Sequence, residues 1–168
     1  RRVLFRSANV DLTPPELVDP FELRDRIARG EWVVDLRSRA VYAAAHVPGA
    51  LNFDMDGAFV NYLAWMIPWG TPLTLLGSMP EQIQAAQREL VRVGIDRPAG
   101  QAVGPLENWL PDAADASTTP RITFHELAHE MDADPSAYVI DTRQVLDWER
   151  GHVKGAVFIP DRKSTRLN

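Results

Sequence analysis

Two histidines and a glutamate have the spacing that zinc-dependent hydrolysis requires. His125, Glu126 and His129 follow the order His-Glu-x-x-His. On a helix this spacing places both histidines on one face, where they can bind zinc while the glutamate acts as general base. No third ligand stands at a similarly clear spacing, although Glu149 and His152 are candidates. A zinc enzyme that uses His125 and His129 is therefore one alternative that the sequence leaves open.

The same helix also has an ordinary structural explanation. Thr123 and Glu126 match the Thr-x-x-Glu capping box that begins many helices, so the glutamate has a role in capping the backbone. Phe124, Leu127 and Met131 form an apolar stripe that we expect to face a core, which leaves both histidines at its flank. These features favour a capped helix without a metal.

A second set of polar residues follows a short apolar strand, and this set occurs twice. Asp35 and Arg37 follow in the first copy of the strand, and His46 and Gly49 come next in a turn. The pattern returns 106 residues later without a gap. The recurring pairs are Val33/Val139, Asp35/Asp141, Arg37/Arg143, His46/His152, Val47/Val153, Gly49/Gly155 and Ala50/Ala156. A repeat of this length predicts two copies of one domain rather than the short units of a solenoid.

Each copy of this motif needs a strand, a helix and a turn to hold it. Residues 32–36 form an apolar run without alternation, which is typical of a central strand in a parallel sheet covered on both faces. The polar residues come at its carboxyl end, where open α/β sheets place functional groups. Ser38 is placed to cap a short helix through Ala45, and Gly49 can supply the positive φ of a tight turn before a strand over 50–53.

Further elements complete the alternation of strands and helices in the first copy. Asp19, Pro20 and Glu22 are typical of a helix start, and Gly30 of a helix end. We expect a helix over 56–66 that is capped by Asp56 and carries an apolar face of Phe59, Tyr62, Leu63 and Met66. A strand over 73–76 follows. The next helix begins with a capping box at Ser78 and Glu81, ends at Gly94, and directs Ile83, Ala86, Leu90 and Val93 inward.

The stretch after this first copy changes in composition. Residues 96–120 are rich in Pro, Gly, Ala, Asp, Ser and Thr and predict a linker, which Trp109 and Leu110 attach to the first domain. The second copy then provides a helix over 124–131, a strand over 138–141, a short helix and a strand over 156–160. Its strands lack the partners that a complete sheet would give them.

These residues resemble the rhodanese family, whose signature is a strand ending in Asp-x-Arg, a short helix with an aromatic residue, and a Gly-His-Ile-Pro-Gly-Ala turn. Residues 45–50 (Ala-His-Val-Pro-Gly-Ala) lack the first glycine of that turn, and residues 151–156 (Gly-His-Val-Lys-Gly-Ala) lack its proline. Residues 29–76 resemble more narrowly the tandem rhodanese tail of bacterial metallo-β-lactamase-fold hydrolases. Residues 29–76 carry this narrower resemblance most clearly, and it extends over residues 8–160.

The resemblance implies a three-layer α/β/α fold with a central parallel sheet, present as one complete copy and a truncated second copy. The expected domains are a rhodanese-like domain over 8–110, a linker over 111–120 and a truncated rhodanese-like domain over 121–161. Residues 1–7 and 162–168 are basic, fit neither copy and resemble translated adapter sequence, so they are interpreted as non-native tails.

The resemblance also implies where a sulfur nucleophile belongs. Active members carry a cysteine at the start of the loop after the fourth strand, where backbone N–H groups cradle an anion and lower the pKa of the thiol. Leu76 or Gly77 stands at that position here. Glu81 stands near the place of the family's loop arginine, so the loop carries a negative charge where binding of an anion requires a positive one. Ser78 has no evident base to activate it and is instead expected to cap its helix. No catalytic residue is therefore expected in the first copy.

The motif residues themselves are interpreted as structural. The aspartate and arginine are expected to tie the strand end to neighbouring loops, and the histidine to fix the turn by hydrogen bonding. This interpretation covers Asp35, Arg37, His46 and Gly49 in the first copy and Asp141, Arg143, His152 and Gly155 in the second.

Composition excludes several functions. The chain has no cysteine, so it can form no disulfide, thiolate nucleophile or zinc–thiolate site. Without the six basic residues of the tails, the formal net charge falls from −5 to about −11, which disfavours nucleic acid and anionic membrane surfaces as partners. Residues 57–80 carry no charge, but Pro68, Gly70 and Pro72 interrupt them, so we expect no membrane span. The expected location is cytoplasmic.

The sequence thus predicts a non-catalytic accessory region of a metallo-β-lactamase-fold hydrolase, linked to sulfur or persulfide metabolism. No cofactor is expected in this region, and the resemblance places a metal in an upstream hydrolase domain. That domain and a sulfur carrier or small thiol are the expected partners. The alternatives are a sulfurtransferase whose cysteine lies in the missing part of the second domain, and the zinc enzyme described above.

Overall fold

The computed structural model of the protein describes residues 11–55 and 58–160. Asp56, the predicted cap of the third helix, lies outside the described residues. The chain divides into two compact units, unit 1 (Arg1–Pro120) and unit 2 (Arg121–Asn168), and each is considered by itself. Within the described residues no helix combines the length and apolar character needed to cross a bilayer.

The sheet of unit 1 has four parallel strands in the order β2-β1-β3-β4. The strands are β1 (Trp32–Asp35), β2 (Leu51–Asn52), β3 (Leu73–Gly77) and β4 (Gly100–Val103). β4 corrects the prediction of a linker from residue 96, because Gly100–Val103 pairs with β3 along its whole length. The sequence does not predict β4 as a strand, because Gly100 and Gln101 interrupt any apolar run there.

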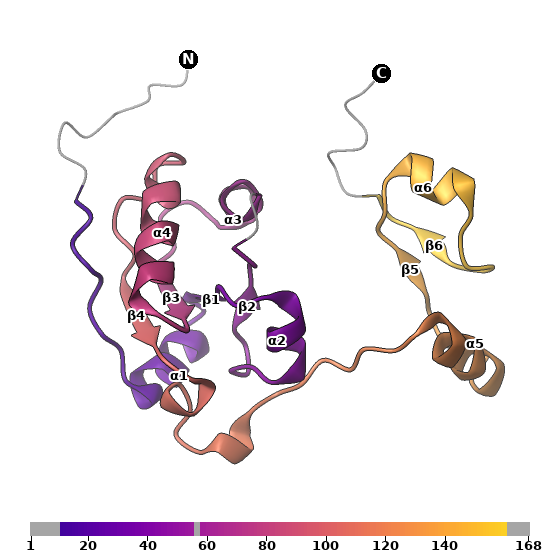
Figure 1. Cartoon of the computed structure of the whole chain (residues 1–168), viewed down its shortest axis with the longest axis horizontal. Helices are drawn as coiled ribbons and strands as arrows, with labels where there is room; N and C mark the ends of the chain where they lie inside the picture. Colours follow the sequence, from indigo (N-terminus) through magenta and orange to yellow (C-terminus); the bar gives the residue numbers. More distant parts are fainter. Residues whose placement is uncertain (1–10, 56–57, 161–168) are drawn as a thin grey trace. The chain divides into compact units, whose positions relative to one another are not determined.

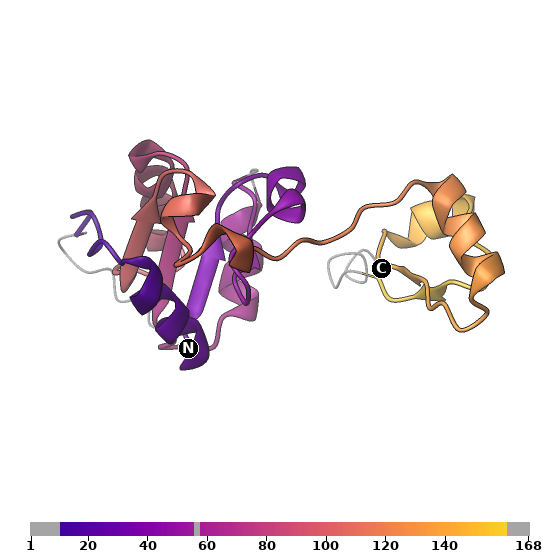
Figure 2. The ribbon, with the colours of Figure 1, turned by 90° about the horizontal axis from the view of Figure 1, so that it is seen from below.

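Helices cover both faces of this sheet, which gives three layers (Figures 1 and 2). The helices are α1 (Pro20–Ala28), α2 (Arg39–Ala44), α3 (Phe59–Met66) and α4 (Pro80–Val91). α3 and α4 pack with Val34, Leu36 and Leu75 on one face, and α1 packs with Val33 and Leu76 on the other. Figure 2 shows α1 and α4 on opposite sides of the strands. The predicted central parallel sheet with flanking helices is confirmed.

A segment after β4 completes the face that carries α1. It contains two short 3-10 helices, Leu106–Asn108 and Ala113–Asp115. Trp109 and Leu110 are buried between this segment and the sheet, as predicted. Ser117 then pairs with the backbone of His46 through two hydrogen bonds of 2.9 Å.

The ends of α1 and the start of α2 agree with the sequence, but α3 begins later than predicted, with Ala58 as an N-cap residue that makes no side-chain cap. The Asp19 side chain accepts hydrogen bonds from the first turn of α1, and Gly30 and Gly94, both with positive φ, end α1 and the turn after α4. The predicted cap of α4 is wrong. Met79 is its N-cap residue and makes no side-chain cap, while the Ser78 N–H donates to the Gln82 side chain.

Unit 2 is small and none of its described side chains is buried. It consists of α5 (Phe124–Ala133), β5 (Ile140–Asp141), α6 (Val145–Arg150) and β6 (Val157–Phe158), with β5 and β6 parallel. The predicted inward stripe of α5 is wrong at Phe124, which is 80% exposed. The predicted stripe of α3 is likewise wrong at Met66, which is exposed, whereas Val60 is buried. In both cases helical periodicity places a residue near the apolar face but does not say where that face ends.

Candidate functional site: the Asp-x-Arg turn and the loop after β3

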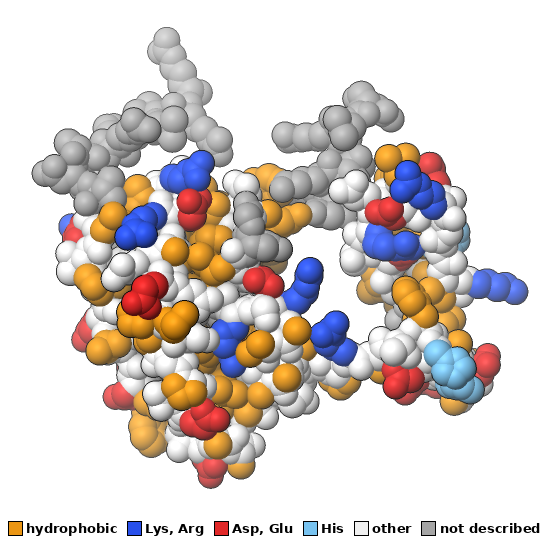
Figure 3. Space-filling model, in the orientation of Figure 1, with side chains coloured by type: hydrophobic (Ala, Val, Ile, Leu, Met, Phe, Trp, Pro, Cys, Tyr) orange, Lys and Arg blue, Asp and Glu red, His pale blue; other side chains and the backbone are white. Residues whose placement is uncertain are grey.

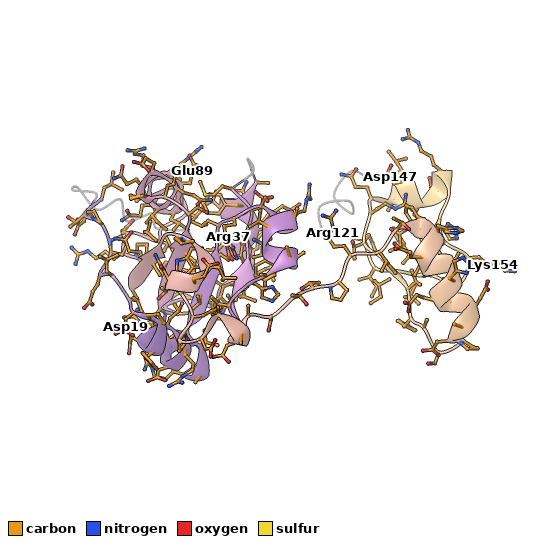
Figure 4. The ribbon with its side chains drawn as sticks, turned by 60° about the horizontal axis from the view of Figure 1, so that its bottom comes forward. Asp19, Arg37, Glu89, Arg121, Asp147 and Lys154 are labelled. Carbon is orange, nitrogen blue, oxygen red and sulfur yellow. The ribbon has the colours of Figure 1, made fainter. Side chains whose placement is uncertain are left out.

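Asp35 and Arg37 form a buried ion pair at the carboxyl end of β1. Arg37 donates from Nε to both carboxylate oxygens at 3.0 Å and from Nη2 to Asp35 Oδ2 at 2.6 Å. Its Nη2 also donates to the Ala45 carbonyl at 2.9 Å, which ties the strand end to the end of α2. The Asp35 side chain is completely buried and that of Arg37 is 9% exposed. Figure 4 shows Arg37 within unit 1, where its guanidinium has all these partners inside the protein.

His46 fixes the turn that follows α2. Its Nδ1 lies 2.8 Å from the Tyr42 carbonyl oxygen, and its ring stacks on the Tyr42 ring with centroids 3.9 Å apart. Tyr42 donates its hydroxyl to the Ala50 carbonyl at 2.6 Å, and burial raises the pKa of that hydroxyl. Gly49 has φ +82°, and a Cβ there would lie 2.6 Å from Ile27 Cγ2. The turn therefore needs glycine both for its backbone angle and for its contact with α1.

The second copy repeats these contacts in a more exposed setting. Arg143 donates from Nη2 to Asp141 at 2.6 Å and to the Gly151 carbonyl at 2.8 Å. The hydrogen bonds that the Arg143 side chain and the Arg143 backbone N–H donate to the carboxylate lower the pKa of Asp141. His152 Nδ1 lies 3.0 Å from the Trp148 carbonyl oxygen. The Arg143 side chain, however, is 49% exposed.

The register of the strands repeats as well. Val34 and Asp35 pair with Leu51 and Asn52 between β1 and β2. Ile140 and Asp141 pair with Val157 and Phe158 between β5 and β6, each 106 residues further on. Gly155 has φ +83°, close to the +82° of Gly49. The two copies thus have the same local backbone arrangement.

The loop after β3 is filled by a side chain of the protein itself. Gln82, in the first turn of α4, accepts a hydrogen bond from the Ser78 N–H through Oε1 at 2.9 Å. Its Nε2 donates to the Leu36 carbonyl at 2.8 Å, which bridges the ends of β1 and β3. A backbone N–H that could bind an anion is therefore already occupied, and the amide that occupies it is anchored at both ends.

Gly77 is the last residue of β3 and is buried. A Cβ at this position would lie 2.9 Å from Ile83 Cδ1 and 3.2 Å from Gln82 Oε1. Leu76, the other candidate for the nucleophile position, is completely buried and packs toward α1. Ser78 and Glu81 are both exposed. Sequence reasoning missed Gln82, because a polar residue in the first turn of a helix gives no signal of a contact 46 residues away.

His125 and His129 lie on neighbouring turns of α5, with ring centroids 4.7 Å apart. Both are exposed, and Figure 3 shows histidine side chains at the surface of this helix. Glu126 is committed to the capping box, since its Oε2 accepts from the Thr123 N–H at 2.6 Å while its own N–H donates to Thr123 Oγ1. Hydrogen bonding by Thr123, first from its backbone N–H and then from its side chain, lowers the pKa of the Glu126 carboxyl group. Over residues 11–55 and 58–160, no three His, Asp or Glu side chains are grouped to hold a metal ion.

Unit 1 is a three-layer α/β domain, because helices cover both faces of its parallel sheet. Its site consists of an Asp-x-Arg strand end and a tight His-x-x-Gly turn. The model of the rhodanese-like domain family matches residues 19–97, which contain β1 to β3 and the loop described above. Unit 1 therefore has a rhodanese-like α/β fold, and residues 19–97 match that domain family.

One curated relative and several solved structures are similar to the chain. The putative sulfur carrier protein YrkF of Bacillus subtilis (strain 168) is 30% identical over 57 residues, which are 32% of this chain and 31% of YrkF. The chain thus spans about a third of the curated relative that it matches.

The solved structures with a TM-score above 0.5 show the fold. The Alr3790 protein from Anabaena sp. has a TM-score of 0.51 at 20% identity, over 67% of this chain and 99% of that one. EanB also has a TM-score of 0.51, at 15% identity, over 90% of this chain and 42% of EanB. A metallo-beta-lactamase from Staphylococcus aureus subsp. aureus COL has a TM-score of 0.45 at 22% identity, over 55% of this chain and 25% of that one.

Proposed function

We propose that this chain is a non-catalytic, rhodanese-like accessory region of a metallo-β-lactamase-fold hydrolase that acts in sulfur or persulfide metabolism. The observation that carries the proposal is the loop after β3. It has no cysteine, a Cβ at Gly77 would meet Ile83, and Gln82 occupies the Ser78 N–H. A domain with this loop has kept the scaffold of a sulfurtransferase but has no nucleophile to carry sulfur.

The link to sulfur chemistry rests on the rhodanese-like domain and on the similarity to a putative sulfur carrier protein. The link to a hydrolase rests on the resemblance of residues 29–76 to the tails of such enzymes. In this proposal the upstream domain holds the metal and performs hydrolysis, and this region binds a sulfur carrier or small thiol. The motif residues, Asp35 and Arg37 among them, maintain the fold.

A sulfur-transfer assay tests the non-catalytic role. The intact chain is incubated with thiosulfate and cyanide, and thiocyanate is measured against an active rhodanese as positive control. We expect no thiocyanate above the buffer rate, and no added sulfur in the protein mass after incubation with a persulfide donor. Turnover by this chain would refute the proposal. Reading the gene upstream of residue 8 tests the hydrolase link separately, because a metal-binding hydrolase sequence must precede this region.

A sulfurtransferase with its cysteine in a longer second domain is the second candidate. The observation that favours it is the register and hydrogen bonding of β5, β6 and Arg143, which repeat those of β1, β2 and Arg37. A cysteine that follows a third strand of unit 2 in the complete gene would support this candidate over the first.

A further inference from the structure

His125 and His129 on α5 are the histidines whose ring nitrogens the fold leaves unused. Both side chains are exposed, and their rings lie on neighbouring turns with centroids 4.7 Å apart. The other two histidines of the chain, His46 and His152, each have Nδ1 at hydrogen-bond distance from a backbone carbonyl. Within residues 11–55 and 58–160, no hydrogen bond or ion pair involves the ring of His125 or His129. These two rings are therefore available as ligands.

The rings are close enough to share one metal ion. Histidine nitrogens bind Zn²⁺ at about 2.0–2.1 Å, so two of them in a tetrahedral site lie about 3.3 Å apart. Side chains four residues apart on a helix are neighbours on one face. Rings with centroids 4.7 Å apart therefore need only small rotations about their side-chain bonds to bring one nitrogen of each to that separation. Because both rings are exposed, no packed core opposes these rotations.

The backbone beneath the histidines is held by the start of the helix. Thr123 and Glu126 form the capping box, and the Leu127 N–H donates to the Thr123 carbonyl at 2.9 Å. Glu126 is bound to the Thr123 backbone, so it does not serve as a general base. Among the described residues no third His, Asp or Glu side chain joins the pair to hold a metal. The arrangement therefore suits a metal held by two protein ligands, and not a hydrolytic centre.

The charge of α5 favours a cation. Between Phe124 and Ala133 the helix carries Glu126, Glu130 and Asp132 and no lysine or arginine. These carboxylates raise the local concentration of cations and oppose the positive end of the helix dipole. The ligands nevertheless set the choice of metal, because imidazole suits zinc, nickel and copper, whereas carboxylates suit magnesium and calcium.

We propose that His125 and His129 of one chain together bind one divalent transition-metal ion of the zinc, nickel or copper class, with water completing its coordination. The ion links two neighbouring turns of α5, and because it binds the folded helix better than the unfolded one, it stabilises that helix. The site uses no residue of the loop after β3 and no residue of an upstream domain. It therefore stands whether or not the proposed function holds.

Isothermal titration calorimetry of the intact, untagged chain tests the site. We expect one Zn²⁺ per chain, tighter binding of Cu²⁺ than of Zn²⁺, and no binding of Mg²⁺. His125→Ala and His129→Ala should each weaken Zn²⁺ binding by about tenfold or more. Light scattering should give the mass of one chain with and without Zn²⁺. In hydrogen-exchange mass spectrometry, Zn²⁺ should slow amide exchange in peptides of α5 in the unchanged chain but not in His129→Ala.

A variant with the same number of histidines at a different spacing is the matched control. His129→Ala combined with Glu130→His places the two rings five residues apart, on different faces of the helix. It should bind Zn²⁺ as weakly as His129→Ala alone, and circular dichroism checks that the helices are retained. No binding of Zn²⁺ by the intact chain, or binding that survives His129→Ala, would overturn the proposal. So would full affinity in the displaced variant, a doubled mass with Zn²⁺, or equal affinity for Mg²⁺, which would assign the ion to the carboxylates.

Discussion

Removing Arg37 should destabilise unit 1 far more than removing Arg143 destabilises unit 2. Both arginines make the same bidentate contact with an aspartate two residues earlier, with 2.6 Å from Nη2 to Oδ2 in each copy. They differ in exposure, 9% for Arg37 and 49% for Arg143. Because Asp35 is completely buried, Arg37→Ala leaves a carboxylate without a counter-charge, which costs about 3–5 kcal/mol. In the second pair Asp141 is only 9% exposed, but the Arg143 guanidinium is 49% exposed and open to solvent, so we expect this pair to contribute about 0–1 kcal/mol, as surface pairs do.

The measurement must report the two units separately. Pulsed hydrogen exchange with mass spectrometry at increasing urea gives an unfolding midpoint for peptides of each unit in the intact chain. We expect Arg37→Ala to lower the midpoint of peptides from β1 and β3 strongly, and Arg143→Ala to change the midpoint of unit 2 peptides little. The double variant Asp35→Asn, Arg37→Met removes both charges and should recover part of the loss, because no unpaired carboxylate remains.

Equal losses in the two single variants would refute this reasoning, since they would show that burial does not set the strength of the pair. Failure of the double variant to recover any stability would show that the Ala45 and Trp109 contacts of Arg37, and not its charge, dominate.

Three other substitutions or conditions test the loop and the capped helix. Gly77→Ala should destabilise unit 1 by about 1–3 kcal/mol in urea titrations, because the added methyl meets Ile83 in a packed core. Gln82→Ala leaves the Leu36 carbonyl without its side-chain donor and should cost about 1–3 kcal/mol without any gain of thiosulfate turnover. The pKa of Glu126 is lowered in the folded state, so its contribution to α5 is present above about pH 4.3 and is lost as the pH falls through the lower folded value. The protection of the Thr123 amide, measured relative to the intrinsic exchange rate at each pH, should therefore decrease in acid, and an unchanged protection factor would contradict the capping-box account.

The elements that the sequence predicts well are those whose signals are local. β1 and β3 are apolar runs, and the start of α1 has an aspartate cap followed by proline. β4 has no such signal. It becomes a strand because β3 offers a free edge, and its Gln101 is satisfied by a hydrogen bond to the Pro15 carbonyl 86 residues away.

The candidate site likewise has local contacts that the sequence predicts and a long-range contact that it does not. The ion pair and the turn could be expected from Asp35, Arg37 and His46, because their partners lie within eight residues. The contact of Gln82 with Leu36 could not, since it joins the ends of two strands that only the finished sheet brings together. The sequence likewise predicts that Trp109 is buried, but not that its indole N–H lacks an acceptor.

The two copies of the motif show which contacts the motif makes by itself and which depend on the rest of the domain. Asp141, Arg143 and His152 reproduce the bonds of their counterparts although the described part of unit 2 has no buried side chain. Short-range hydrogen bonds are therefore sufficient to shape the turn. Burial in unit 1 comes from elements outside the motif, namely α1 and the segment around Trp109. The recurrence of the motif accordingly explains how the turn is built, and any function has to be sought in the residues that differ between the copies or lie outside them.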